Sequence, residues 1–246
     1  AGRSNHFQVF QLIECRLLPL EYNFGSYAMA SDELLLELAE EGICSLRFYT
    51  WAEPTVSLGY FQPSSLLSNS QELKLLPWVR RATGGEALVH HHELTYALGL
   101  PLEIAGQKST LWQEKIHLII QKALSLLGVS LPEINLPELR NDPTNLLCFH
   151  HHAPQDLIIK KHKVVGSAQR KKKRSVIQHG GILLAQSIYT PSLPGILELS
   201  GIKLCPEKLA ETIVNECRHA LGWDFNTSKW SHEEEARIQH FVEHRF

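Results

Sequence analysis

Two strand-like runs joined by a short basic segment constrain the fold of this chain most. Residues 156–169 (DLIIKKHKVVGSAQ) and 175–185 (SVIQHGGILLA) are rich in β-branched residues, and RKKKR at 170–174 separates them. This pattern predicts a β-hairpin with a basic tip. The chain therefore contains a sheet.

Other segments alternate between strand-like and helical patterns. Residues 45–51 (SLRFYTW) and 55–61 (TVSLGYF) predict a pair of strands around a turn, 76–82 predict a third strand, and 86–101 predict strand, polar bend and strand. Apolar residues at three- and four-residue spacing predict helices over 26–41, 110–127, 207–222 and 232–246. Ser231 and Glu234 form a capping pattern before the last of these. The proline-dotted segment 130–143 predicts a surface loop.

These elements predict an α+β fold in which a mixed sheet is flanked by helices. A chain of 246 residues can bury a substantial core. We expect a catalytic unit over 1–203 and a C-terminal helical extension, 204–246, packed on it as part of one domain.

Composition limits the partners and the compartment. The 24 Lys and Arg residues nearly balance the 26 Asp and Glu residues, so the net charge of −2 predicts neither a nucleic acid nor a membrane partner. The five cysteines are odd in number and lack a CxxC pair, which argues against a disulfide framework and a cysteine zinc site. A reducing cytoplasm fits best. No apolar run approaches the roughly 18 residues of a membrane span.

Two short motifs suggest chemistry. Arg80 and Arg81 precede the pair Gly84 and Gly85, so cations and approachable backbone amides lie together, although a glycine pair is more often only a tight turn. The second motif is KVVGSAQ at 163–169, where a lysine lies beside a floor of small residues. Its alternative is an edge strand with a solvated lysine.

Three strings carry a family resemblance. Residues 47–62 (RFYTWAEPTVSLGYFQ), 80–98 (RRATGGEALVHHHELTYAL) and 163–184 (KVVGSAQRKKKRSVIQHGGILL) resemble, in this order, the biotin/lipoate protein ligase superfamily. They span most of the chain from about Phe24 to Leu184. The resemblance implies the catalytic-domain fold of the biotin and lipoate ligases.

Within that superfamily the chain is most similar to Cys-dependent octanoyltransferases of the lipoate-protein-ligase-like type. Their nucleophile lies in a loop upstream of the lysine motif, where this chain has Cys148. The ATP-using ligases typically carry a third glycine where this sequence has Glu86. A second type of octanoyltransferase has its cysteine downstream, where only Cys205 and Cys217 are available. From its residues alone Cys148 fits a buried small hydrophobe better than a nucleophile, since burial is the usual fate of a free cysteine.

The resemblance implies transfer of octanoyl from acyl carrier protein, through a Cys148 thioester, to a lysine of a lipoyl domain or the glycine-cleavage H protein. Lys163 would contact the acyl carbonyl and help deprotonate the incoming amine. The predicted substrate-binding residues are Arg80, Arg81, Gly84, Gly85, His90, Gly166, Ser167 and Ala168. No cofactor is implied, and ATP and Mg²⁺ enter only for a ligase.

Histidine runs at 90–92 and 150–152 invite a metal interpretation. Neighbouring strand side chains point to opposite faces, so we predict no metal site. His151 and His152 could neighbour the thiolate, and His179 matches a family position that supports the hairpin. Between Lys160 and Arg174 lie eight Lys or Arg residues, which predict either a solvated hairpin end or a docking surface for an acidic carrier.

Three other functions stay open. An ATP-dependent lipoate-protein ligase would require ATP and free lipoate. An amidotransferase would take its acyl group from one lipoyl carrier and pass it to another. A carrier-binding protein without catalysis would form no adduct on Cys148.

Overall fold

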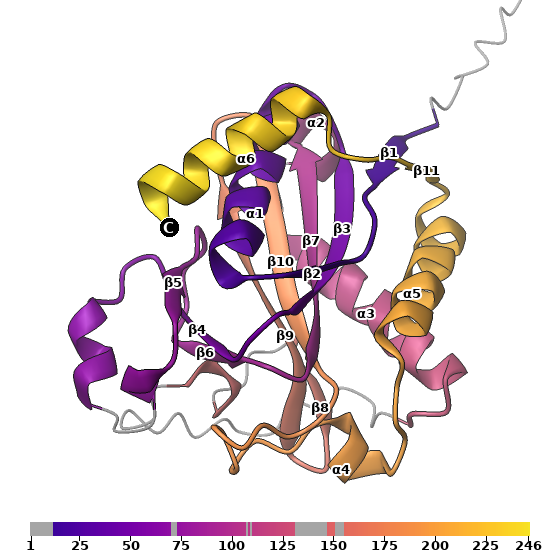
Figure 1. Cartoon of the computed structure of the whole chain (residues 1–246). Helices are drawn as coiled ribbons and strands as arrows, with labels where there is room; N and C mark the ends of the chain where they lie inside the picture. The colour runs from indigo at the N-terminus through magenta and orange to yellow at the C-terminus, as the bar shows by residue number, and fades with distance from the viewer. Residues whose placement is uncertain (1–11, 70–72, 107, 109, 131–146, 151–154) are drawn as a thin grey trace, which may run out of the picture.

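The computed structural model describes residues 12–69, 73–106, 108, 110–130, 147–150 and 155–246 (Figure 1). The strands are β1 (Glu14–Leu17), β2 (Glu21–Asn23), β3 (Ser45–Trp51), β4 (Thr55–Leu58), β5 (Trp78–Arg80), β6 (Leu88–His90), β7 (Glu93–Pro101), β8 (Leu157–Ile159), β9 (His162–Lys171), β10 (Ser175–Leu183) and β11 (Asp224–Thr227). The helices are α1 (Gly25–Glu40), α2 (Leu102–Ala105), α3 (Thr110–Leu126), α4 (Ile196–Ser200), α5 (Pro206–Leu221) and α6 (His232–Arg245), with short 3₁₀ helices η1 (Ser64–Asn69), η2 (Leu73–Leu75) and η3 (Cys148–His150).

A large mixed sheet forms the centre of the fold. Its strand order is β11-β1-β3-β7-β10-β9-β8, and β2 pairs with β3. The pairs from β3 through β7, β10 and β9 to β8 are antiparallel, whereas β1 runs parallel to β3 and β11. The predicted hairpin and the mixed sheet with flanking helices are therefore confirmed.

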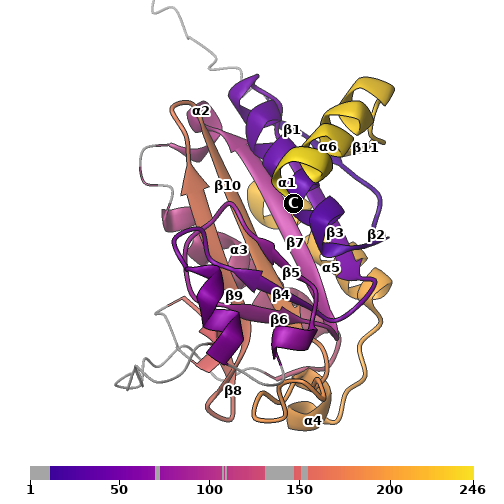
Figure 2. The same cartoon turned by 60° about the vertical axis from the view of Figure 1, so that its left-hand side comes forward.

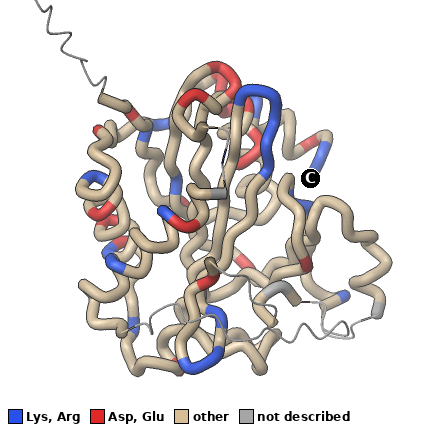
Figure 3. The backbone as a smooth tube through the Cα atoms, turned by 180° about the vertical axis from the view of Figure 1, so that it is seen from behind, with Lys and Arg blue, Asp and Glu red and all other residues tan. Residues whose placement is uncertain are grey.

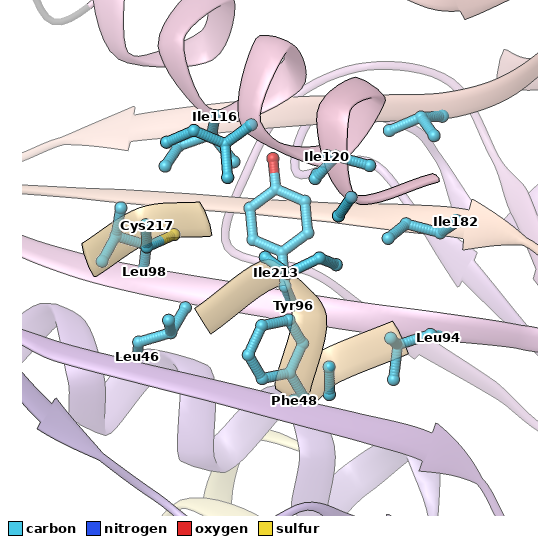
Figure 4. Packing of buried hydrophobic residues seen from close by; sticks show 14 of the residues in the cluster. Leu46, Phe48, Leu94, Tyr96, Leu98, Ile116, Ile120, Ile182, Ile213 and Cys217 are labelled. Carbon is cyan, nitrogen blue, oxygen red and sulfur yellow. The ribbon is translucent and has the colours of Figure 1, made fainter. Parts of the chain in front are cut away.

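Helices cover both faces of the large sheet. Alternate residues of β7 divide between the faces, as the two-residue period of a strand requires. Figure 4 shows Tyr96 lying against Ile116 and Ile120 of α3, within the main buried cluster, which also includes α5. Ala97 packs on the other face with Met29 of α1. Cover on both faces explains why every residue of β7 is buried.

Residues 45–51 and 55–61 both contain strands, but the prediction that the two strands pair with each other is wrong. β3 enters the large sheet, where Phe48 lies opposite Tyr96. β4 instead forms a small sheet in the order β5-β4-β6, which lies to the left of the large sheet in Figure 1 and in front of it in Figure 2. Composition made the two runs look alike, but the bend between them carries the chain from one sheet to the other.

The C-terminal segment contains a strand as well as helices. β11 pairs in parallel with β1 along 14–17. α5 packs on α3, and α6 packs on α1. The predicted cap is confirmed, because the Ser231 hydroxyl accepts from the Glu234 backbone while the Glu234 carboxylate accepts from the Ser231 backbone. The boundary near 203 stays a prediction.

The cations between 160 and 174 form two groups rather than one tip. Lys160 and Lys161 lie in the turn before β9, whereas Lys172, Lys173 and Arg174 follow its other end. β9 is ten residues long, so the groups are about 30 Å apart. Figure 3 shows them at opposite ends of the molecule.

Two further predictions concern a surface loop and membrane spans. Residues 131–143 of the predicted surface loop lie outside the described residues. Within the described ranges, none of the helices has the length and apolar character needed to cross a membrane.

Candidate functional site

A cavity of about 180 Å³ lies where the loops of the small sheet meet the β9–β10 hairpin. Met29, Leu88 and Phe149 give it apolar walls from α1, β6 and η3. Eight of the predicted site residues line it: Arg81, Gly84, Gly85, His90, Lys163, Gly166, Ser167 and Ala168. A concave apolar space with a few polar groups is suited to a small acyl ligand.

Lys163 is one of two buried cations that line this cavity, the other being Arg81. The Lys163 side chain is only 5% exposed, and its Nζ lies 2.8 Å from Oδ2 of the buried Asp156. The lysine extends over Gly166, where an added Cβ would lie 2.2 Å from the Lys163 Cε. A side chain at 166 would therefore displace the lysine. Asp156 holds the ammonium in place, and sequence patterns alone did not identify it.

Beyond Val165, β8 no longer covers the edge of β9. Their pairing reaches only Val165. On the other edge of β9, Gly166 lies opposite Gly181 of β10. Because glycine has no side chain, the backbone at Gly166 and Gly181 forms part of the cavity surface. Peptide N–H groups placed this way can stabilise negative charge on a carbonyl oxygen.

The hydroxyl of Ser167 is held by a histidine on α3. His117 is buried, and its Nδ1 donates to the carbonyl of Gln155, so Nε2 accepts from the Ser167 Oγ at 2.8 Å. Burial lowers the pKa of His117, which keeps the imidazole neutral for this role. The one available sequence signal was a histidine on the apolar face of α3.

His90 and Arg81 are anchored together. His90 stacks on Trp51 with ring centroids 3.8 Å apart, its Nδ1 lies 2.7 Å from Glu93 Oε1, and its Nε2 lies 2.6 Å from Ser57 Oγ. Arg81 also donates to Ser57, at its carbonyl and its hydroxyl. Both side chains are thus fixed in the cavity wall.

The two arginines of the glycine motif act in different places. Arg81 donates to the carbonyls of Gly84 and Glu86, which braces the glycine loop. Arg80 lies outside the cavity lining and donates to the carbonyls of Gly59 and Tyr60 and, in addition, Gln62. In the structure Arg80 holds the turn after β4 in place. Its expected role in substrate binding stays a prediction.

Cys148 is the first residue of η3, and its side chain lies outside the described residues. The residues on either side of it, Leu147 and Phe149, are described. Leu147 forms a parallel bridge with Ala87 at the end of the glycine motif. Phe149 lines the cavity, with its ring centroid 5.3 Å from Lys163 Nζ. Position 148 therefore lies between a residue paired with the glycine motif and a residue of the cavity wall.

A buried charge network joins the glycine motif to α1. Asp32 lies 2.8 Å from the fully buried Arg47 and accepts from Tyr49 at 3.0 Å. It also accepts from Nδ1 of His179, whose Nε2 lies 2.5 Å from the Thr83 hydroxyl. Burial works to lower the pKa of Arg47, but Asp32 offsets it and the pKa is raised. His179 thus links the hairpin, the helix and the glycine loop.

Replacing Asp32 with alanine is expected to lower the free energy of unfolding by about 3–5 kcal/mol, because Arg47 keeps its buried charge and loses its main partner. Urea unfolding followed by circular dichroism measures this. Glu37→Ala on the same helix is the matched control. Its partner Arg237 is 29% exposed, so the loss should stay within about 1 kcal/mol. If both variants lose the same free energy of unfolding, the buried network does not stabilise the fold more than an exposed ion pair does.

The other cysteines do not line the cavity. Cys15, Cys44 and Cys217 are buried, and burial raises the pKa of Cys217 to about 12, which disfavours a thiolate. Cys205 is exposed, and its Sγ lies 2.8 Å from Glu207.

The histidine runs lie differently from the strand geometry assumed for them. His91 and His92 follow β6 in a bend, and their rings stack with centroids 3.6 Å apart. His151 and His152 lie outside the described residues. Among the residues that the structure does describe, no group of three potential ligands could hold a metal ion.

The sequence matches a known family over most of its length. The sequence model of the lipoyl protein ligase A/B catalytic domain matches residues 25–200. The octanoyltransferase LipM of Brevibacillus brevis is 36% identical over 171 residues, covering 65% of this chain and 62% of the relative. The LipM of Macrococcus caseolyticus is 32% identical over 190 residues, covering 72% and 68%. The chain thus spans less than two thirds of the Brevibacillus relative.

Solved structures support the fold. A structure from the analysis of a bi-partite lipoate protein ligase and its E2 lipoyl domain from Thermoplasma acidophilum has a TM-score of 0.70 at 17% identity, covering 94% of this chain and 93% of that one. A lipoate-protein ligase A bound with ATP has a TM-score of 0.71 at 18% identity, covering 94% and 95%. The fold is that of the lipoate ligase catalytic domain.

Proposed function

This chain belongs to the lipoyl protein ligase A/B catalytic domain family, and on that premise we propose that it transfers an octanoyl group from acyl carrier protein to a protein lysine. The acceptor is a lipoyl domain or the glycine-cleavage H protein. One observation carries the proposal: η3 begins at Cys148 and contributes Phe149 to the same cavity into which Lys163 projects. The octanoyltransferases among its relatives support it.

In the first step the Cys148 thiolate attacks the carbonyl carbon of the octanoyl thioester. A new C–S bond forms, the donor's C–S bond breaks, and the carrier leaves as a thiol after taking up a proton from the Lys163 ammonium, which leaves Lys163 neutral. Attacking and leaving groups are both thiols, so this exchange is close to thermoneutral and needs no nucleotide. The basic Lys163 nearby favours the thiolate form of Cys148.

In the second step a lysine amine of the acceptor attacks the acyl-enzyme. The C–N bond forms, the bond to Cys148 breaks, and the amide is released downhill in free energy. Lys163, left neutral by the first step, takes the proton from the amine, and the backbone beyond Val165 stabilises the tetrahedral oxyanion. The apolar cavity walls hold the acyl chain.

Intact-mass spectrometry tests this reaction directly. Incubation with octanoyl carrier protein should add one octanoyl group to the enzyme, and a lipoyl acceptor domain added afterwards should remove it. An enzyme that carries no octanoyl group under these conditions contradicts the proposed thioester.

The same assay separates the alternatives. A ligase would modify the acceptor only with ATP and free lipoate or octanoate, and an amidotransferase would prefer octanoyl H protein as donor. The contacts of Arg80 favour transfer over ligation, because its guanidinium is bound to backbone carbonyls and lies outside the cavity lining. No modification with any donor, combined with complex formation, would indicate a carrier-binding protein.

A further inference from the structure

An exposed aromatic pair lies in the turn after β4. Tyr60 is 47% exposed and Phe61 is 87% exposed, with their rings in an edge-to-face arrangement at 5.0 Å between centroids. Exposed aromatic side chains of this kind are enriched in protein interfaces and are costly to leave in water. The catalytic steps do not use either ring, so the pair calls for another explanation.

A basic segment borders this aromatic pair. The guanidinium of Arg170 lies 5.1 Å from the centroid of the Tyr60 ring. The next four residues are Lys171, Lys172, Lys173 and Arg174. Glu33 lies near Arg170 and Lys172, at 3.6 Å from each, which leaves a clear excess of positive charge. We call Tyr60, Phe61 and residues 170–174 the aromatic–basic surface.

The aromatic–basic surface is fastened to the glycine loop of the cavity. The Tyr60 amide donates to the carbonyl of Thr83 at 2.9 Å, and Arg80 donates to the carbonyls of Gly59 and Tyr60. Gly59 packs so closely that an added Cβ would lie 1.8 Å from the Gly85 carbonyl oxygen. The surface therefore shares its backbone supports with the cavity.

The chemistry of the surface selects its partner. A positive rim around exposed aromatic rings fits a protein that is acidic and offers a small apolar contact. The distance along β9 from Lys163 to Arg170 is about 23 Å, from seven residues of strand. A lysine side chain is too short to cover this span, whereas an acyl group on a long flexible carrier arm can do so.

We propose that the aromatic–basic surface is the docking site for the acidic carrier protein that donates the acyl group. This inference rests on the proposed function and adds the place where its donor binds. The donor docks beside the glycine loop, and its acyl arm enters the cavity from there. Lys160 and Lys161, at the opposite end of β9, do not take part.

Charge reversal at the two ends of β9 tests the proposal. Lys171→Glu/Lys173→Glu is expected to raise the KM for octanoyl carrier protein about tenfold at low salt, with the effect shrinking as salt screens the charges. The matched control is Lys160→Glu/Lys161→Glu, which makes the same charge change and should leave this KM unchanged. Octanoyl-pantetheine, a donor without the protein, should react equally with all variants.

A second pair of variants tests the aromatic contact. Phe61→Ala should raise the same KM about tenfold, because exposed aromatic anchors dominate many interfaces. Ile188→Ala removes a side chain that is 79% exposed after the far end of β10, and it should have no effect. Fold is unaffected in either case, since both side chains lie in solvent.

The outcomes are distinguishable from failure of the proposed function. The Kd of the unacylated carrier, measured by calorimetry, needs no transfer and should rise in parallel with KM. If wild-type enzyme forms no acyl adduct yet binds the carrier through this surface, the reaction is wrong and the docking site stands. An unchanged Kd in the 171/173 and 61 variants overturns the docking site, as does a rise only in the acceptor's KM.

Discussion

Cys148→Ala is expected to abolish octanoyl transfer, with a loss of roughly 10³-fold or more. The thiolate is the one group that can accept the acyl chain in the proposed two-step route, so no acyl-enzyme should appear by intact mass. The transfer assay uses octanoyl carrier protein as donor and a lipoyl domain as acceptor. In wild-type enzyme, peptide mapping should locate the octanoyl group on Cys148.

Cys205→Ala is the matched control for this experiment. Cys205 is an exposed cysteine outside the cavity, so a non-specific acylation would involve it first. Its removal should leave both adduct and transfer intact. Full activity in Cys148→Ala would refute the nucleophile, even if the fold and the family assignment stand.

Lys163→Arg is expected to stall the reaction after the first step. The guanidinium keeps the positive charge facing Asp156, which limits the damage to the buried pair. It cannot take a proton from the incoming amine, because arginine does not deprotonate in proteins. Transfer should fall by about 10²–10⁴-fold, and the octanoyl group should persist on Cys148 after the acceptor is added.

The decisive measurement is the rate at which the acceptor discharges the isolated acyl-enzyme. Lys161→Arg, in the turn before β9, makes the same substitution at an exposed position and should discharge at the wild-type rate. A wild-type discharge rate in Lys163→Arg would assign the proton transfer to another group. A variant that forms no acyl-enzyme would instead show that the first step already requires the amine of Lys163.

Much of the cavity followed from motifs in the chain. The run 163–169 and the glycine motif contain most of its polar lining, because residues close in sequence stay close in space. The residues that hold this lining in place were not predicted from the sequence. Asp156, His117 and Asp32 reach the site from a loop and two helices. Asp156 contacts Lys163 across the β8–β9 turn, and the partners of His117 and Asp32 lie 50 and 147 residues away along the chain. No local pattern reports such a contact.

The sequence by itself determined the hairpin of β9 and β10, the four long helices and the residue types around the cavity, since these depend on short-range periodicity and turn chemistry. Only the tertiary structure decided that β3 and β4 enter different sheets and that the C-terminal β11 pairs with β1. It also separated Lys161 from Lys173 at the two ends of β9. Such pairings are chosen by burial of surfaces distant in sequence, which a local pattern does not encode.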